Sequence, residues 1–285
     1  ELFVTEQLPK PERVFVEKNF YKVLFQENLQ EKFEEAEARE ALENFIKSQS
    51  QTILERISYE LSQSQFKPVF VEKNLEGACL SVNGKRIDLA GKVDRIDEAG
   101  DYFRIIDYKT GKVGGVIKDL YYGDKLQLFV YQKAVGQMLG KASAGALYFD
   151  CKWEYAEEGE DKSILKGIIS NDEEAIAKFD NAIEVKGKSD IVSIALSSAK
   201  SKKGMFKGSA ISKLPLSVYE NYAQTICEKA LAEMEEGYIL PKPDESSCSA
   251  CKYLGICLQG KNKGVRKKER IGQNDFSSFK GGENA

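Results

Sequence analysis

The chain has 285 residues, of which 42% are hydrophobic and 31% are charged, and its formal net charge is −3. A chain of this size buries a full core, as one large domain or two small ones. The slightly acidic net charge argues against a uniformly basic protein that coats nucleic acid. No apolar run is long enough to span a bilayer. The chain has no His, which excludes imidazole as a catalyst or metal ligand within it.

A long helix is the first element that the sequence predicts. Apolar residues recur at helical spacing through residues 31–65, and a break near 48–51 would divide the helix. We assign residues 1–66 to an N-terminal helical part. The chain begins Glu-Leu-Phe, with neither an initiator Met nor a signal peptide pattern, so we expect it to be cut from a longer protein, with a processed terminus as the alternative.

Strand signals follow this helix. The dipeptides Asn-Gly at 83–84 and Ala-Gly at 99–100 separate runs that are rich in β-branched and aromatic residues. An antiparallel meander of four strands is therefore predicted, at residues 68–72, 78–82, 86–96 and 102–108.

Helix and strand patterns alternate in the next part of the chain. A helical pattern at 120–140 is followed by strand patterns at 145–153 and 163–169. A strand–helix–strand order is typical of a mixed sheet. The fold class is therefore α/β (α+β mixed), with a mixed central β-sheet flanked by helices.

The remaining sequence predicts two more helices, a loop and a tail. The helices are expected at 173–184 and 216–237, and the second has an apolar face made of Val218, Tyr222, Ile226, Leu231 and Met234. Residues 197–212 predict a mobile loop, whose lysines either touch nucleic acid or are simply solvated: Lys200, Lys202, Lys203 and Lys207. Beyond Gln259 the composition turns basic and Gly-rich, so disorder is expected for residues 261–285.

Two aspartates and a lysine stand out in residues 91–111, which read GKVDRIDEAGDYFRIIDYKTG. Side chains alternate along a strand, so Asp107 and Lys109 face the same way. Asp94 lies on the partner strand of a hairpin, where cross-strand neighbours are roughly 5–8 Å apart. We therefore expect the three groups to meet at the end of a sheet.

This constellation suits metal-dependent hydrolysis. Mg²⁺ prefers oxygen ligands, and water that it binds becomes a better nucleophile. The Lys109 ammonium would orient that water or stabilise the charge on the phosphorus centre. The alternative is structural: Asp94 and Asp107 would be surface carboxylates paired with Arg95 or Arg104.

The sequence Gly-x-Val-Asp-Arg-Ile-Asp, followed by Ile-Ile-Asp-Tyr-Lys-Thr-Gly, resembles the PD-(D/E)xK nuclease core of the RecB-like family. Within it, the resemblance is strongest to the carboxy-terminal nuclease domain of AddB-type helicase–nuclease subunits. It implies a restriction-endonuclease-like core over residues 67–240. It also implies that Asp94, Asp107 and the Tyr108 carbonyl bind Mg²⁺ (or Mn²⁺) and that Lys109 is the catalytic lysine, while Asp97 of the same motif is expected to be structural.

A helical Gln and Tyr extend the resemblance. Gln127 and Tyr131 are four residues apart and therefore share a helix face, and they match the family's Gln-x₃-Tyr pattern. The resemblance implies that both face the active site, whereas on their own they would be surface and core residues. The family's upstream His ligand is missing from this chain. We expect that it lay in a removed segment, with a weakened or inactive site as the alternative. Glu72, on a strand before the motif, would either compensate for the missing ligand or be an exposed strand residue, which is the interpretation we favour.

Three cysteines form the second site that the sequence predicts. Cys248, Cys251 and Cys257 lie close together in residues 241–260, and clustered thiolates indicate a bound metal. Their spacing resembles the iron–sulfur clasp of AddB-type nucleases, where a structural [4Fe–4S] cluster takes its fourth Cys from far upstream. We expect the fourth ligand to lie in the removed upstream segment, because the other thiols are expected to be packing residues: Cys79, Cys151 and Cys227. Without that ligand the cluster would be lost, and residues 245–260 would be loose or carry zinc. The alternative is that the three clustered thiols bind nothing.

The resemblance implies a metal-dependent DNA exonuclease. It would be the nuclease domain of a cytoplasmic helicase–nuclease in double-strand break repair and recombination, acting on DNA, most readily single-stranded, that a helicase partner subunit supplies. No membrane is involved. Two alternatives stay open: an inactive nucleic-acid-binding scaffold of the same fold, and a CRISPR-associated processing exonuclease.

Overall fold

The structure, a computed structural model, describes residues 36–75, 79–82, 85–110, 113, 115–151, 163–197, 205–238, 248, 251–253, 255–257, 269 and 271–279. Several predicted features lie outside these residues: the start of the first helix, the turn at 83–84, most of the segment 258–270, and Lys200, Lys202 and Lys203.

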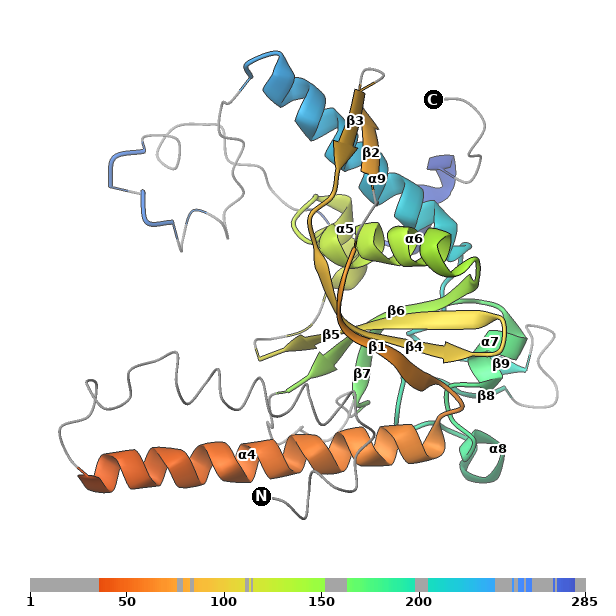
Figure 1. Ribbon diagram of the computed structural model, residues 1–285. Coiled ribbons are helices and arrows are strands. Elements are labelled where there is room, and N and C mark those ends of the chain that lie inside the picture. Colours follow the sequence, from red (N-terminus) through yellow and green to blue (C-terminus); the bar gives the residue numbers. More distant parts are fainter. Residues whose placement is uncertain are drawn as a thin grey trace.

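A mixed five-stranded sheet forms the centre of the molecule, in the order β1-β4-β5-β6-β7. Its strands β5 and β6 are parallel and the other neighbours are antiparallel. Helices cover both faces of this sheet, α4 on one side and α6 and α9 on the other (Figure 1). The bounds of these strands are β1 Lys67–Asn74, β4 Lys92–Ala99, β5 Tyr102–Lys109, β6 Ala142–Asp150 and β7 Leu165–Ile169. The predicted α/β class with a mixed central sheet is confirmed.

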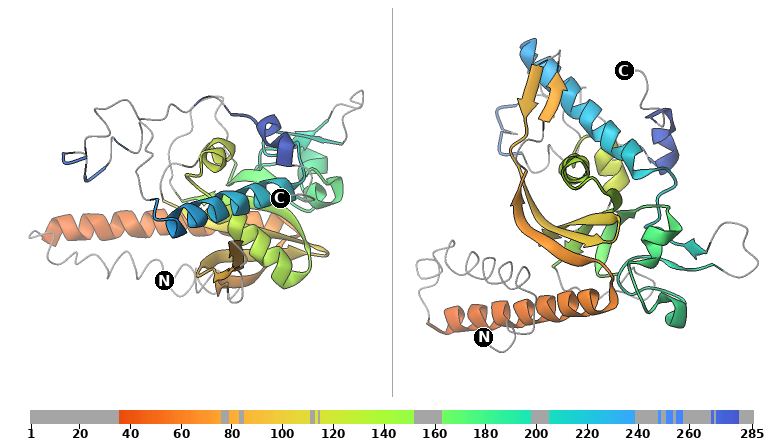
Figure 2. Two further views of the ribbon diagram at one scale, coloured as in Figure 1. Left: turned by 90° about the horizontal axis from the view of Figure 1, so that it is seen from above. Right: turned by 45° about the vertical axis from the view of Figure 1, so that its right-hand side comes forward.

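Each face of the sheet has its own apolar core. Helix α4 (Ala36–Gln63) buries Leu54, Ile57 and Leu61 against one face and continues past the edge of the sheet (Figures 1 and 2). It is one helix over the described range, without the predicted break. Helices α6 (Gln127–Leu139) and α9 (Leu216–Glu235) cover the other face. The two cores fix the sheet as a central layer.

The connection from β5 to β6 brings the ends of these strands to one edge. The helix predicted at 120–140 is divided into α5 (Val116–Tyr121) and α6, because Gly123 adopts a left-handed conformation with a φ of 77° between them. Gly140, with a φ of 63°, ends α6. Since β5 and β6 run in parallel, Lys109 and Asp150 lie side by side at their carboxyl ends.

The predicted meander is wrong in its pairing. The expected strand 86–96 is two strands, β3 (Lys85–Asp88) and β4, because the chain leaves the extended ladder at residues 89–91. Strand β1 pairs with β4, and β2 (Cys79–Val82) forms a separate hairpin with β3. Local turn signals cannot reveal this exchange of partners.

The helix predicted at 173–184 is also divided, into α7 (Glu173–Ala177) and α8 (Ile183–Lys186). The carboxylate of Asp180, between them, accepts the backbone N–H of Ala182 and the Ser189 hydroxyl, which favours a turn there. The short strand β8 (Ala195–Leu196) precedes the predicted loop at 197–212, but β9 (Phe206–Lys207) lies inside it. The prediction of a mobile loop is wrong for its last residues, because Ile211 bridges Ile169 of β7.

The C-terminal part differs from the sequence prediction at two places. In α9, Val218 and Tyr222 are buried as predicted, but Met234 is 59% exposed because the helix end extends past the core. In the tail that was expected to be disordered, Gln273–Phe279 forms the 3₁₀ helix η2 and buries Phe276 completely. Within the described residues, no helix combines the length and apolar composition that crossing a membrane requires.

Candidate active site

The register of β4 and β5 brings the two aspartates together. Arg95 lies opposite Ile106, and extending this antiparallel register by one residue puts Asp94 opposite Asp107. Directly opposed side chains point to the same face of a sheet. Lys109, two residues further along β5, shares that face, which is the one covered by α6.

Contacts of the three residues agree with this register. The backbone N–H of Tyr108 donates to Asp94 Oδ2 at 3.0 Å, and the Lys109 Nζ lies 2.5 Å from Asp107 Oδ2. The alternative in which Arg95 or Arg104 pairs with these aspartates is wrong. Both arginines point to the opposite face, because their partners there are the buried carboxylates Glu60 and Asp97.

Burial dominates the electrostatics of Asp94 and raises the pKa of its carboxyl above the ordinary value of 3.8. The negative charges of Asp107 and Glu72 raise this pKa further. The Tyr108 N–H and the Lys109 ammonium oppose the rise. The site therefore concentrates negative charge that a cation would neutralise.

Tyr148 lies beside Lys109 on the neighbouring strand β6. Tyr148 lies opposite Asp107 in the parallel β5–β6 ladder, and the Lys109 Nζ is 5.7 Å from the centre of its ring. Burial, together with the charges of Asp107 and Asp119, raises the pKa of Tyr148 to about 12. Asp119 is on α5 and pairs with Lys125 at 2.7 Å. The ammonium of Lys109 is thus held between a carboxylate and an aromatic face.

Tyr131 of helix α6 packs against Gly91, the first residue of the motif that carries Asp94. A Cβ on Gly91, three residues before Asp94, would lie 2.6 Å from the Tyr131 hydroxyl oxygen. Only glycine allows this close approach, and the pattern of the motif, which Gly91 opens, does not by itself reveal that requirement. Gln127, at the start of α6, is exposed. The proposed roles of Gln127 and Tyr131 stay predictions.

Glu72 stands near Asp94 in an unusual backbone conformation. Val71 and Lys73 pair with Arg95 and Val93, so Glu72 itself lies at the register position opposite Asp94. Among the described residues it is the non-glycine residue with a positive φ, 54°, and its carboxylate pairs with the Lys92 ammonium. A left-handed conformation is strained for Glu.

A divalent cation suits this donor set. Asp107 Oδ2 is buried and accepts no hydrogen bond of good geometry from the described residues, although the Lys109 ammonium stands beside it. Oxygen atoms of this kind are what Mg²⁺ and Mn²⁺ prefer. In the part of the chain that the structure describes, however, no three Asp, Glu or Cys side chains already surround one point. The metal-binding roles of Asp94, Asp107 and the Tyr108 carbonyl therefore stay predictions.

Comparison with known proteins identifies the family. A sequence model of the PD-(D/E)XK nuclease superfamily matches residues 9–258. The chain belongs to the PD-(D/E)XK nuclease superfamily. It is also 32% identical, over 248 residues, to a subunit of the ATP-dependent helicase/deoxyribonuclease of Clostridium tetani (strain Massachusetts / E88), covering 75% of this chain and 21% of that protein.

Two further relatives carry the same name. Identity is 30% over 236 residues with the protein of Clostridium botulinum (strain Hall / ATCC 3502 / NCTC 13319 / Type A), covering 70% of this chain and 20% of that protein. It is 29% over 205 residues with the protein of Bacillus mycoides (strain KBAB4), covering 61% and 17%. This PD-(D/E)XK chain thus spans about a fifth of the length of the curated relatives it matches. The predicted resemblance to the family is confirmed.

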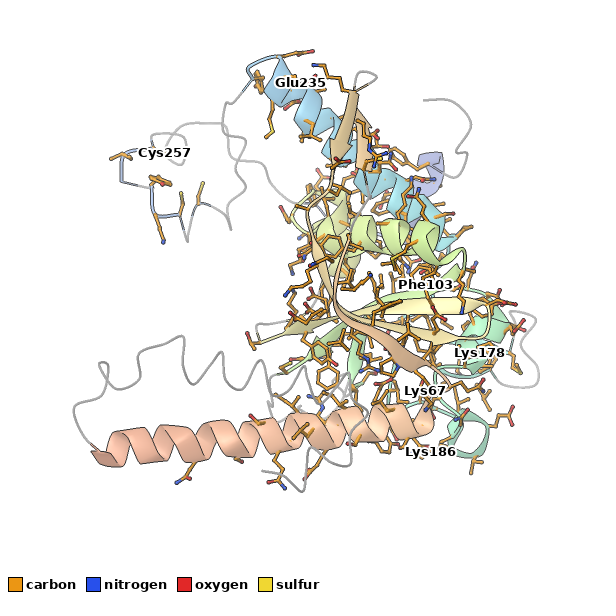
Figure 3. All side chains as sticks on the ribbon, viewed as in Figure 1. Lys67, Phe103, Lys178, Lys186, Glu235 and Cys257 are labelled. Carbon is orange, nitrogen blue, oxygen red and sulfur yellow. The ribbon has the colours of Figure 1, made fainter. Side chains whose placement is uncertain are left out.

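The cysteine triplet of this PD-(D/E)XK chain lies in a segment with backbone turns. The Cys251 N–H donates to the Cys248 carbonyl at 3.2 Å, and the Cys257 N–H donates to the Tyr253 carbonyl at 2.8 Å. All three thiols are free, and Figure 3 shows Cys257 well apart from the sheet. Their role as iron–sulfur ligands stays a prediction, because the described side chains form no ready metal group.

The other three cysteines divide into two classes. Cys151 and Cys227 are half-buried and pack against the two cores, as predicted. Cys79 is exposed, so the packing prediction is wrong for it: its strand β2 belongs to the separate hairpin rather than to the central sheet. Burial raises the pKa of Cys151 to about 12, which disfavours the thiolate that a metal ligand requires.

Proposed function

We propose that this chain is a metal-dependent deoxyribonuclease that hydrolyses phosphodiester bonds at the Asp94–Asp107–Lys109 site. One observation carries the proposal: the Lys109 ammonium lies 2.5 Å from a buried oxygen of Asp107, and the register of the adjacent strand β4 puts Asp94 opposite Asp107. The membership in a nuclease superfamily supports it.

Each residue of the site has a role that follows from its side-chain chemistry. Asp94, Asp107 and the Tyr108 carbonyl would hold Mg²⁺ or Mn²⁺, which when bound polarises the phosphodiester and acidifies a water molecule. Lys109 donates hydrogen bonds to the charged oxygens of the reacting phosphate. Tyr131 and Gln127, on one face of α6, orient the phosphate or the lysine.

The names of the relatives support a wider setting. Those proteins are named as one subunit of an ATP-dependent helicase/deoxyribonuclease. We infer that this chain is an exonuclease that acts on DNA, most readily on single strands. A helicase partner subunit would supply that DNA during double-strand break repair in the cytoplasm. Cys248, Cys251 and Cys257 would hold a structural [4Fe–4S] cluster together with a fourth ligand from a longer protein.

The test compares two lysine variants on end-labelled single-stranded DNA with Mg²⁺ or with a chelator. Lys109→Met should reduce cleavage by about 100- to 1,000-fold, because it removes a cation that stabilises transition-state charge. Lys141→Met is the matched control: Lys141 is half-buried and pairs with Glu98, but it lies next to Ala142, at the opposite end of the β5–β6 ladder from Lys109. It should cut like the unchanged chain.

The outcomes separate the proposal from its alternative. Metal-dependent cleavage that Lys109→Met abolishes and Lys141→Met retains supports the nuclease. Equal cleavage by both variants would refute the assignment of Lys109. Binding of DNA without cleavage at any Mg²⁺ or Mn²⁺ concentration would favour the inactive scaffold, which the absence of His in this chain makes the second candidate.

A further inference from the structure

A closed network of buried charges lies on the face of β4 and β5 opposite the active site. Arg95 and Arg104 each contact Asp97 and, across the interface with α4, Glu60. The Arg95 guanidinium donates to Asp97 Oδ1 at 2.7 Å and to Glu60 Oε2 at 2.8 Å. The side chains of all four residues are at most 1% exposed.

One branch of this network reaches Tyr108. The Arg95 Nη1 donates to the Tyr108 hydroxyl at 3.2 Å. On the other face, the backbone N–H of Tyr108 donates to Asp94 at 3.0 Å. Tyr108 is therefore held from both faces of the sheet, and it separates Asp107 from Lys109 in the chain.

We propose that Arg95 and the Tyr108 phenol are positioning residues, which set the orientation of the peptide between Asp107 and Lys109. This inference rests on the proposed function, because it concerns the same site. It adds a role for the back of the sheet: the docking of α4, through Glu60, fixes the backbone that presents the Tyr108 carbonyl and the Asp94 carboxylate.

The physical reason is the rigidity of the arginine. A guanidinium held by two carboxylates in a buried setting has no freedom to follow a moving partner. Its remaining N–H therefore offers Tyr108 one fixed position. Removing a group that orients a metal ligand, without itself binding the metal, typically lowers the affinity for the metal by about 10- to 100-fold.

The experiment compares Tyr108→Phe with Tyr102→Phe. Both residues are on β5 and both phenols are hydrogen bonded, since Tyr102 donates to Asp172 at 2.8 Å. Tyr102, however, is at the opposite end of the strand from Lys109. Binding of Mn²⁺ is measured calorimetrically without DNA, and cleavage is measured as a function of Mg²⁺ concentration.

Tyr108→Phe should weaken Mn²⁺ binding by about 10-fold and raise the Mg²⁺ concentration for half-maximal cleavage by the same factor. Excess Mg²⁺ should restore its maximal rate, which a merely misfolded variant would not recover. Tyr102→Phe should match the unchanged chain in both measurements. An Arg95→Lys variant, which keeps the charge but loses the planar fork, should behave like Tyr108→Phe.

The result that overturns the inference is distinct from failure of the proposed function. If the unchanged chain binds Mn²⁺ and cuts DNA, but Tyr108→Phe and Arg95→Lys do so at the same metal concentrations, the positioning role is wrong and the nuclease stands. If the unchanged chain neither binds Mn²⁺ nor cuts DNA, the proposed function and this inference fail together.

Discussion

The Asp94 carboxylate accepts the backbone N–H of Tyr108, so a side chain of β4 is fixed to the backbone of β5 beside Asp107. This bond keeps the aspartate next to a second carboxylate and in a buried setting. Two neighbouring buried carboxylates repel each other in the metal-free protein, and such a pair is typical of a site that binds a cation.

Asp94→Asn is expected to stabilise the metal-free protein at neutral pH. Folding raises the pKa of Asp94 above 3.8, so the folded chain binds this proton more tightly than the unfolded chain. Stability is therefore lost as the pH rises from 3.8 through the folded pKa, by about 1.4 kcal/mol for each unit of the rise. Asn removes the charge and keeps an oxygen for the Tyr108 N–H.

Urea unfolding with a chelator present checks this expectation. The gain in the free energy of unfolding should be largest at neutral pH and should vanish below pH 3.8, where the carboxyl is protonated in both states. Asp101→Asn, at an exposed position in the β4–β5 turn, should give no gain. A gain that does not change with pH would contradict the electrostatic explanation.

Gly91→Ala is expected to lower cleavage while the fold is retained. The new methyl group would lie 2.6 Å from the Tyr131 hydroxyl oxygen, and the end of that side chain can move aside. Displacing a group in the site by about 1 Å reduces the rate by on the order of 100-fold. The measurement is the rate on single-stranded DNA, with circular dichroism to verify the fold.

A double-mutant cycle tests whether Tyr131 transmits the effect. If it does, Gly91→Ala should cause no further loss in a Tyr131→Ala background. Gly136→Ala, in the same helix, is the control, since its nearest neighbour would be Phe103 at 3.4 Å. If the rate of the double variant falls by the product of the two single losses in rate, the effect of Gly91→Ala does not act through Tyr131.

The active-site strand pair could be predicted from the sequence because its information is local. Alternation fixes the shared face of Asp107 and Lys109, and a hairpin fixes the partner strand that carries Asp94. The roles of these residues came from resemblance rather than from spacing, which alone also allowed pairing with Arg95 or Arg104.

Long-range partners were the part that the sequence could not show. Glu60 lies 35 residues before Arg95, and nothing local indicates that the two meet. A signal was nevertheless present, because Arg95 and Arg104 interrupt apolar strands, and a buried arginine requires carboxylate partners. The pairing of β1 with β4 is likewise a long-range contact that local sequence does not indicate, because the β2–β3 hairpin separates the two strands in the chain.

Glu60→Ala is expected to destabilise the fold by about 3–5 kcal/mol, because it leaves two buried arginines with one carboxylate fewer. The measurement is the free energy of unfolding in urea. Glu55→Ala, at an exposed position of α4, is the matched control and should change stability by less than about 0.5 kcal/mol. A loss for Glu60→Ala no larger than that of Glu55→Ala would show that the network contributes little net stability.

Phe276→Ala is expected to destabilise the protein by about 3–5 kcal/mol, although composition indicates a disordered tail. Phe276 is fully buried, and the centre of its ring lies 4.8 Å from that of Tyr222 and 5.1 Å from that of Tyr219, both on α9. Asn274→Ala, at an exposed position in the same 3₁₀ helix, should have little effect. Equal melting temperatures for the two variants would mean that η2 detaches in solution, and a lower temperature for Phe276→Ala alone would establish it as part of the core beside α6 and α9.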